Sequence, residues 1–253
     1  MGESTKRTAF VTGASYGVGA AIALALAHDG FDVAVSATRA ENLSDTVAKL
    51  EATGVRTIPL VLDLRSQPSI ERAMADIISA FGHLDVLVNN AGVHLRKRAV
   101  DVTWAEWDAV MAINLTGTFF LTQQAGRHLI GGGRPGSIVS IASTHGLVGM
   151  AERSVYGIAK GALIQMTRML AIEWAQYGIR VNAIAPGRLV TPSPSRAALT
   201  SDPKYMEAMR ARIPLKRLAT AEEVAQAVCY LVGPQAASIT GQTLVLDGGL
   251  TVA

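Results

Sequence analysis

The chain has 253 residues, of which 49% are hydrophobic and 17% charged, with a formal net charge of +3 at pH 7. Its lysines and arginines are dispersed and form no basic stripe with interleaved aromatic residues, which argues against a nucleic-acid-binding protein. The single cysteine, Cys229, excludes an intrachain disulfide and a cysteine-based metal site.

The first residues, MGESTKRTAFVTG, lack a long apolar stretch, and no window of about 18 uninterrupted apolar residues occurs. We therefore expect a cytoplasmic protein without a membrane span. The charged fraction lies below the roughly 25% of an average soluble domain. This shortage of charge predicts either a surface covered by another subunit or a single domain with a large core.

Short β-branched runs alternate with longer helical patterns along the chain. The runs predicted as strands are 9–13, 32–37, 57–64, 84–92, 136–143, 179–187 and 241–249. The patterns predicted as helices are 19–30, 41–53, 68–81, 104–129, 152–177 and 221–232. Several strands are nearly continuous apolar runs, which is typical of strands covered by helices on both faces. The sequence therefore predicts an α/β protein of Rossmann type, with a doubly wound, mostly parallel sheet of seven strands.

No linker rich in proline or glycine divides the chain, so we expect one domain over residues 1–253. Residues 188–214 are the one irregular insert and contain four of the nine prolines. Because this insert follows the carboxyl end of a predicted strand, it is interpreted as a substrate lid. A surface excursion without a function is the alternative.

The first predicted strand leads into TGASYGVG, residues 12–19. Gly13, Gly17 and Gly19 permit a tight turn and a close approach of a pyrophosphate, and the following helix offers free N–H groups and a positive dipole end. A glycine triplet between a strand and a helix predicts a dinucleotide site. The other residues of this turn that are expected to contact the cofactor are Ser15, Tyr16 and Val18.

The end of the second predicted strand indicates which dinucleotide is bound. An acidic residue there would hold both ribose hydroxyls of NAD and repel a 2′-phosphate, but the sequence has Ala37. With Ser36, Thr38 and Arg39 nearby, this favours NADP(H) over NAD(H). A solvated loop cation is the alternative interpretation of Arg39.

The segment SVYGIAKGAL, residues 154–163, places Tyr156 and Lys160 on one face of a predicted helix. A free tyrosine has a pKa near 10, which a neighbouring ammonium lowers toward the range useful for acid–base catalysis. Such a pair is also common on solvated helix faces, so the motif is weak alone. Gly157 and Gly161 follow the pair, although each glycine costs about 1 kcal/mol in a helix interior. We expect room beside the reacting centre at Gly157 and close helix packing at Gly161.

In order, TGxxxGxG at 12–19, NNAG at 89–92, Asn114, Ser143 and YxxxK at 156–160 resemble the short-chain dehydrogenase/reductase family. The resemblance covers almost the whole chain. Within the family, the chain is similar to the group that contains 3-oxoacyl-carrier-protein reductases and gluconate 5-dehydrogenases. It implies an NAD(P)-dependent oxidoreductase (EC 1.1.1.-) that interconverts a carbonyl and a secondary alcohol, and a homotetramer. It disfavours an enoyl reductase, in which the tyrosine and lysine are farther apart.

The resemblance also implies roles for individual residues. Tyr156 exchanges a proton with the substrate oxygen, Lys160 lowers the tyrosine pKa and binds the nicotinamide ribose, and Ser143 polarises the carbonyl. Asn114 keeps its helix irregular and holds a water that connects Lys160 to solvent. Thr191, with the backbone near Leu189, fixes the nicotinamide carboxamide. The other implied cofactor-binding residues are Asp63, Leu64, Asn90, Ala91, Gly92, Pro186 and Gly187.

Two features of this set leave alternatives open. Asp63 is interpreted as a contact to adenine, as an acid at a helix N-terminus, or as both. Tyr16 stands where members that prefer NADP often carry a basic residue, which counts against NADP(H).

The substrate pocket is less well defined by the sequence. By position, we expect it to be lined by His94, Arg96, His145, Met150 and Arg188, with no catalytic metal. Arg96, Lys97 and Arg188 indicate an anionic or polyhydroxylated small molecule, unless Arg96 and Lys97 face solvent. His145 is expected to be a pocket-wall residue and not a second acid–base group. The alternative function is a catalytically idle NAD(P)-binding regulator or scaffold, although such proteins commonly lose a reacting residue.

Overall fold

The computed structural model describes residues 6–189 and 202–253. Seven strands form one sheet in the order β3-β2-β1-β4-β5-β6-β7, and each neighbouring pair is parallel. The strands are β1 (Thr8–Val11), β2 (Asp32–Ala37), β3 (Thr57–Val61), β4 (Val86–Asn89), β5 (Gly136–Ile141), β6 (Ile179–Pro186) and β7 (Thr243–Leu246). The predicted Rossmann-type sheet is confirmed, and its described strands are parallel throughout.

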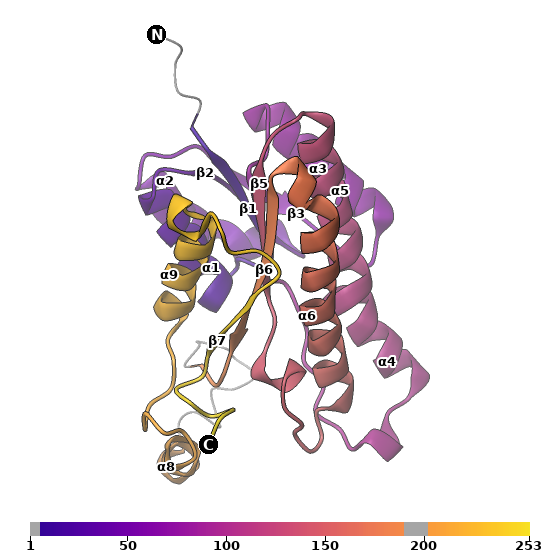
Figure 1. Ribbon diagram of the computed structural model, residues 1–253, viewed down its shortest axis with the longest axis vertical. Helices are drawn as coiled ribbons and strands as arrows, with labels where there is room; N and C mark the ends of the chain where they lie inside the picture. The colour runs from indigo at the N-terminus through magenta and orange to yellow at the C-terminus, as the bar shows by residue number, and fades with distance from the viewer. Residues whose placement is uncertain (1–5, 190–201) are drawn as a thin grey trace.

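Helices cover both faces of this sheet (Figure 1). The helices on one face are α1 (Gly17–His28), α2 (Ser44–Glu51) and α9 (Ala221–Val232). The helices on the other face are α3 (Gln67–Phe81), α4 (Trp104–Met111), α5 (Thr118–Gly131) and α6 (Ser154–Trp174). The short 3₁₀ turns are η1 (Ala40–Leu43), η2 (Ala99–Asp101), η4 (Thr144–Gly146), η5 (Ala175–Tyr177) and η6 (Pro234–Ala236). None of the helices within the described residues is long and apolar enough to cross a bilayer.

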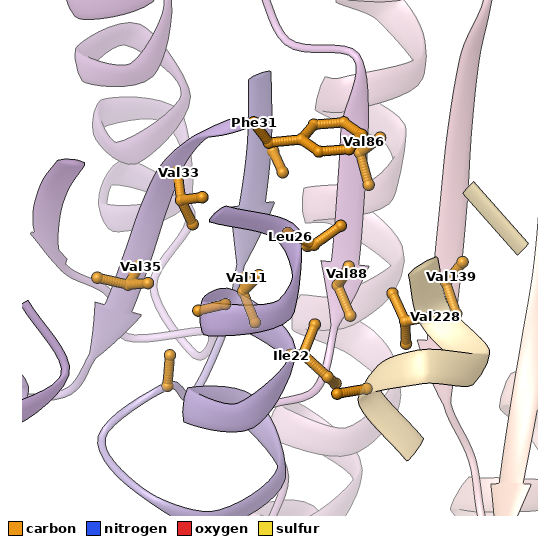
Figure 2. Close-up of a cluster of buried hydrophobic side chains, with 14 of the residues drawn as sticks. Val11, Ile22, Leu26, Phe31, Val33, Val35, Val86, Val88, Val139 and Val228 are labelled. Atoms are coloured by element: carbon orange, nitrogen blue, oxygen red, sulfur yellow. The ribbon is translucent and has the colours of Figure 1, made fainter. Parts of the chain in front are cut away.

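Alternate residues of the central strands enter two separate cores. Val11 of β1 joins the cluster under α1 and α9, whereas its neighbour Phe10 joins the cluster under α3, α5 and α6. Figure 2 shows the first cluster, in which Ile22 and Leu26 of α1 and Val228 of α9 lie over the sheet. Burying one such side chain stabilises the fold by roughly 1.5–3 kcal/mol. Because both faces of the inner strands are buried, strands such as β1, β2 and β4 carry apolar residues at successive positions.

The long helix predicted over 104–129 is interrupted. A π-helical turn, η3 (Ala112–Gly117), separates α4 from α5. Within it, the Asn114 side chain bonds the backbone of Val93. Directly after it, the hydroxyl of Thr118, the first residue of α5, donates to the carbonyl of Ile113, five residues earlier. A Cβ atom on Gly117 would overlap the Leu64 carbonyl oxygen. The widened turn therefore brings the helix against the loops that follow β3 and β4.

The insert at 188–214 is more regular than predicted. It contains α8 (Pro203–Ala211), in which the Asp202 carboxyl accepts the Lys204 N–H at 3.0 Å and Pro203 occupies the first position. In Figure 1, α8 lies at the end of the molecule opposite the N-terminus. Residues 190–201 are outside the described residues, so the proposed lid is described only in part.

Candidate active site

A cleft of about 880 Å³ lies at the carboxyl ends of the central strands. Its walls come from the loops after β1, β2, β3, β4, β5 and β6 and from α6 and α8. The chain passes from β1 to β2 and β3 on one side and to β4, β5 and β6 on the other, so the cleft straddles the switch point of the sheet. Ligands of doubly wound sheets bind at this place.

The glycine turn forms one end of the cleft. Gly13 and Gly17 have φ angles of +66° and +63°, which side chains rarely permit. A Cβ atom on Gly19 would overlap the Gly13 carbonyl oxygen. The first N–H groups of α1 have no side-chain cap, since Tyr16 at the N-cap position makes no capping bond. These groups and the helix dipole fit the phosphates of a dinucleotide.

Thr12 and Asn90 hold the glycine turn against the end of β4. The Thr12 hydroxyl oxygen accepts the N–H groups of Asn90 and Ala91, each at 3.0 Å. The Asn90 amide donates to the carbonyls of Thr12 and Gly13, each at 2.9 Å. Asn90 thus has a structural role besides lining the cleft, and Thr12 is a supporting residue that the sequence analysis did not identify.

The end of β2 lines the cleft next to the glycine turn. Ser36 and Thr38 face it as predicted, and Asn42, which was not predicted, joins them. Arg39 is exposed and is not among the residues that line the cleft. This position agrees with its alternative interpretation as a solvated loop cation.

Asp63 lines the cleft and forms a two-pronged ion pair with Arg65. The oxygen–nitrogen distances are 2.8 and 2.9 Å. This bonding from Arg65 holds the pKa of Asp63 below its ordinary value. The cap of α3 is Ser66, whose hydroxyl accepts the Ser69 N–H. Asp63 therefore does not cap that helix.

Tyr156 and Lys160 lie together on the buried face of α6 at the wall of the cleft. The Lys160 Nζ lies 5.8 Å from the centre of the Tyr156 ring and donates to the Ile141 carbonyl at 2.7 Å. Burial lowers the pKa of Lys160 to about 8. At neutral pH the ammonium form still dominates, but it holds its proton less firmly than an exposed lysine does. The Tyr156 ring stacks on His94, with centroids 4.4 Å apart.

Asn114 lies behind the cleft wall and does not line it. Its carboxamide oxygen accepts the Val93 N–H, and its amide nitrogen donates to the Val93 carbonyl, both at 2.8 Å. A Cβ atom on Gly92 would come within 3.2 Å of the Asn114 oxygen and 3.6 Å of the Lys160 Nζ. Gly92 thus leaves space between the asparagine and the lysine. The predicted irregularity of the helix at Asn114 is present as the π-helical turn.

Ser143 follows β5 and lies in a row of polar contacts. Its hydroxyl oxygen accepts the His145 N–H at 3.2 Å and is 3.3 Å from His145 Nδ1. His145 Nε2 is 3.0 Å from the Met150 sulfur, which is 3.8 Å from an Arg188 nitrogen. The His145 ring also meets the Tyr156 ring edge-on at 5.9 Å. Residues from two loops, the one between β5 and α6 and the one after β6, are thereby arranged beside the tyrosine.

The two glycines of α6 have different surroundings. A Cβ atom on Gly157 would lie 2.8 Å from the His145 carbonyl oxygen, whereas one on Gly161 would lie 3.4 Å from the Gly146 carbonyl oxygen. Gly157 is therefore the glycine that permits close packing, because η4 with His145 lies directly against it. Gly161 faces the same turn at an ordinary contact distance.

The structure brings most of the predicted site residues to one cleft. Those that line it are Gly13, Ser15, Tyr16, Gly17, Val18, Gly19, Ser36, Thr38, Asp63, Leu64, Asn90, Ala91, Gly92, His94, Arg96, Ser143, His145, Tyr156, Lys160, Pro186, Gly187, Arg188 and Leu189. Met150 instead lines a smaller adjoining cavity. Thr191 lies outside the described residues.

The sequence predicted that the insert lines the pocket as a lid, but it did not predict the helix α8 or the residues by which α8 lines the cleft. Tyr205, Met206 and Met209 line it from that helix. Their spacing of three and four residues was the available signal, but it lies within a segment interpreted as irregular. Arg153, which precedes α6 and donates to the Leu95 carbonyl at 3.4 Å, was also missed.

Two of the three predicted substrate-binding cations are neutralised by carboxylates. The Arg96 Nε is 2.6 Å from Glu152, and the Lys97 Nζ is 2.8 Å from Glu106. Arg96 still borders the cleft, whereas Lys97 is absent from its lining. In the part of the chain that the structure describes, no three His, Cys, Asp or Glu side chains are grouped so as to hold a metal ion.

Comparisons with known proteins agree with this geometry. A family model described as enoyl-(acyl carrier protein) reductase matches residues 13–251. Glucose 1-dehydrogenase of Gluconobacter oxydans is 36% identical over 96% of this chain and 91% of that protein. Cis-4-hydroxycyclohexanecarboxylate dehydrogenase of Sinomonas cyclohexanicum is 39% identical over 99% of each.

A solved structure of a variant actinorhodin polyketide ketoreductase with NADPH aligns over all of both chains. Its TM-score is 0.93 and its sequence identity 36%. With matches of this extent, and with the glycine turn, the tyrosine and the lysine arranged on one cleft, the chain belongs to the short-chain dehydrogenase/reductase family.

Proposed function

We propose that this protein is an NAD(P)-dependent oxidoreductase that interconverts a carbonyl and a secondary alcohol. The observation that carries the proposal is the placement of Tyr156 and buried Lys160 on the wall of a cleft whose other end is an uncapped glycine turn. The matched family model is described as an enoyl reductase. The four-residue spacing of Tyr156 and Lys160 on α6 favours carbonyl chemistry over reduction of a carbon–carbon double bond.

The residues of the chain supply orientation and proton transfer. A bound nicotinamide nucleotide supplies or accepts the hydride. In the direction of reduction, the Tyr156 hydroxyl donates its proton to the carbonyl oxygen as the carbon gains hydride, and the Lys160 ammonium stabilises the phenolate. The Ser143 oxygen accepts the His145 N–H, so its own O–H can donate to the substrate oxygen. Oxidation reverses these steps.

We further propose NADP(H) as the preferred cofactor. Ala37 ends β2, and the residues from Ser36 to Asn42 that line the cleft include no carboxylate. The lining residue Asp63 is held by Arg65, which offsets its charge. A site without a free acid there accepts a 2′-phosphate more readily than a site with one. The ketoreductase relative, whose structure contains NADPH, is consistent with this preference.

The decisive variant is Tyr156→Phe. Because it removes the proton donor and leaves the ring, we expect turnover of ketones to fall by roughly 10²–10⁴-fold. Dissociation constants for NADPH and NADH, measured by fluorescence titration, should stay within about twofold of the wild type, with NADPH bound more tightly. Turnover is followed by NADPH absorbance with ketones, sugars and β-ketoesters. An unchanged rate in the variant would remove Tyr156 from its role, and binding without turnover of any carbonyl would indicate a regulator.

A homotetramer is proposed as the assembled state. Phe120 of α5 and Ile158, Met169 and Ile172 of α6 are exposed apolar side chains, and Ile172 is 78% exposed. Exposed apolar side chains clustered on two neighbouring helices mark a surface that another subunit covers. This proposal also gives a reason for the low charged fraction of the sequence.

A further inference from the structure

Two arginines meet at a side cavity that opens beside the candidate active site. The cavity has a volume of about 90 Å³ and shares His145, Arg188 and Met209 with the main cleft. Arg212 lines the side cavity but not the main cleft. Since water occupies about 30 Å³ per molecule in the liquid, this space suits a group of two or three heavy atoms. A carboxylate has this size.

Neither arginine is neutralised by a carboxylate within the described residues. The Arg188 guanidinium contacts the Tyr205 hydroxyl at 3.3 Å and the Met150 sulfur at 3.8 Å, which are both uncharged. No carboxylate oxygen there lies within 4.0 Å of Arg188 or Arg212. Residues 190–201 contain no aspartate or glutamate in their sequence. Arg188 is half-buried, whereas Arg212 is exposed at the surface. The charge of Arg188 is therefore available to a ligand, and Arg212 can reach the same ligand from the surface.

Two other arginines of the cleft are paired with carboxylates. Arg65 pairs with Asp63 at 2.8 Å and Arg96 with Glu152 at 2.6 Å. Among the cations that line the main cleft, Arg188 is the one that also lines the side cavity.

The remaining walls of the side cavity are mostly apolar. They include Val148, Met150, Ile213 and Leu250. Beside such walls, a charge-assisted bond between a guanidinium and a carboxylate is stronger than it is in open water. Arginine matches a carboxylate with two parallel donors, which favours this anion over a neutral hydroxyl.

The position of the side cavity constrains the substrate further. Ser143 and Tyr156 line the main cleft but not the side cavity, whereas Arg188 lines both and Arg212 lines the side cavity alone. A carboxylate in the side cavity therefore lies in a different space from the reacting carbon. An α-keto acid, whose carboxylate is bonded directly to the reacting carbon, does not place the two groups in separate cavities.

We propose that the substrate is a secondary alcohol, or the matching ketone, that carries a carboxylate several bonds from the reacting carbon. The carboxylate binds Arg188 and Arg212 while the reacting oxygen lies at Ser143 and Tyr156. In oxidation the carbon loses a hydride to the nicotinamide and the hydroxyl loses its proton to Tyr156, so the carboxylate takes no part in the chemistry. This inference rests on the proposed function.

The first test compares an acid with its neutral ester. Reduction of 4-oxocyclohexanecarboxylate, its methyl ester and pyruvate is measured with NADPH. For the wild type we expect kcat/KM to be at least about tenfold higher for the acid than for the ester, the low end of what a hydrogen bond to a charged group contributes. Pyruvate should be the poorest substrate of the three. An ester reduced as well as the acid would overturn the proposal.

Variants then locate the effect. Arg188→Met should lower kcat/KM for the acid by about 10- to 100-fold and leave the ester within about twofold. Arg188→Lys should retain part of the preference, and Arg212→Met should show a smaller loss. The matched control is Arg210→Met, because Arg210 is exposed on α8 and outside the lining of both cavities. An equal loss for acid and ester in Arg188→Met would assign Arg188 a merely structural role.

A binding measurement separates this inference from the proposed reaction. Calorimetric titration with cyclohexanecarboxylate and cyclohexanecarboxamide needs no turnover. For the wild type, we expect the carboxylate to bind at least about tenfold more tightly than the carboxamide. For Arg188→Met, we expect this preference for the carboxylate to be lost. Equal binding of the two probes overturns the carboxylate site even if ketones are reduced. Carboxylate-specific binding without turnover of any ketone contradicts the proposed function and leaves the anion site standing.

Discussion

Lys160 places a charged group inside the protein at the wall of the cleft. Its Nζ donates a hydrogen bond to the Ile141 carbonyl, and the residue is only 4% exposed. Removing the ammonium from water disfavours its charged form, which is why burial lowers the pKa of Lys160 to about 8. The chain therefore gives up stability at neutral pH to keep a cation beside Tyr156.

This cost predicts how stability depends on pH. The unfolded chain keeps the ordinary lysine pKa of 10.5, so between about pH 8 and 10.5 it binds more protons at this site than the folded chain. Above about pH 10.5, Lys160 is neutral in both states and does not destabilise the folded chain. As the pH falls from 10.5 toward 8, the unfolded chain takes up the proton first, so the free energy of unfolding decreases. Relative to Lys160→Met, the cofactor-free wild type should gain roughly 2–3 kcal/mol across this window.

Urea unfolding of both proteins at equal chain concentration, at about pH 7 and pH 10, measures this difference. Subtracting the change measured for Lys160→Met from the change measured for the wild type removes the contribution of all other titrating groups. Parallel changes in the two proteins would show that the lysine is not desolvated.

At the scale of elements, the site depends on how η4 packs on α6. The turn contains His145 and follows Ser143, and its backbone lies against Gly157 and Gly161. A Cβ atom on Gly146 would itself come within 2.7 Å of the Lys160 carbonyl carbon. Small residues on both sides therefore let the serine and the tyrosine, which belong to different elements, face the same cleft.

The two glycines of α6 provide a matched pair of variants. Gly157→Ala places a methyl group 2.8 Å from the His145 carbonyl oxygen and should destabilise the protein by about 1–3 kcal/mol. It should also lower kcat/KM, because the shifted turn moves Ser143. Gly161→Ala meets its nearest atom at 3.4 Å and should be neutral or stabilising by up to about 1 kcal/mol.

Urea unfolding and ketone reduction measured on both variants check this difference. Equal effects of the two substitutions would contradict the packing argument.

At the scale of the whole molecule, one sheet separates two cores and places the site at its carboxyl edge. The helices α5 and α6 close the second core and turn their exposed apolar side chains outward. Phe120 and Ile172 are among these side chains. The proposed tetramer would bury them.

Light scattering at micromolar concentration should therefore give the mass of four chains. Combined Phe120→Asp and Ile172→Glu substitutions should reduce that mass, because an interface cannot bury unpaired carboxylates without a large penalty. Val61→Glu is the control, since Val61 is exposed on β3 and away from these helices. A monomeric wild type would reject the tetramer.

Much of the fold and the candidate site was predictable from short-range patterns. The alternation of apolar strands and helices predicts the sheet, because each element must bury an apolar face. The spacing of Gly13, Gly17 and Gly19 predicts the turn, and the spacing of Tyr156 and Lys160 predicts a shared helix face. The helix break at Asn114 was expected only from the family resemblance, because the hydrogen bonds that widen it come from Val93.

By itself, then, the sequence determined the fold class, the glycine turn and the shared helix face of Tyr156 and Lys160, since each depends on local spacing along the chain. Tertiary structure alone decided which of the predicted cations are paired with carboxylates. Arg96 and Lys97 find carboxylates on Glu152 and Glu106, whereas Arg188 finds a hydroxyl and a thioether. Whether a cation is paired with a carboxylate depends on residues that folding brings from distant segments of the chain. A local sequence pattern does not identify these residues.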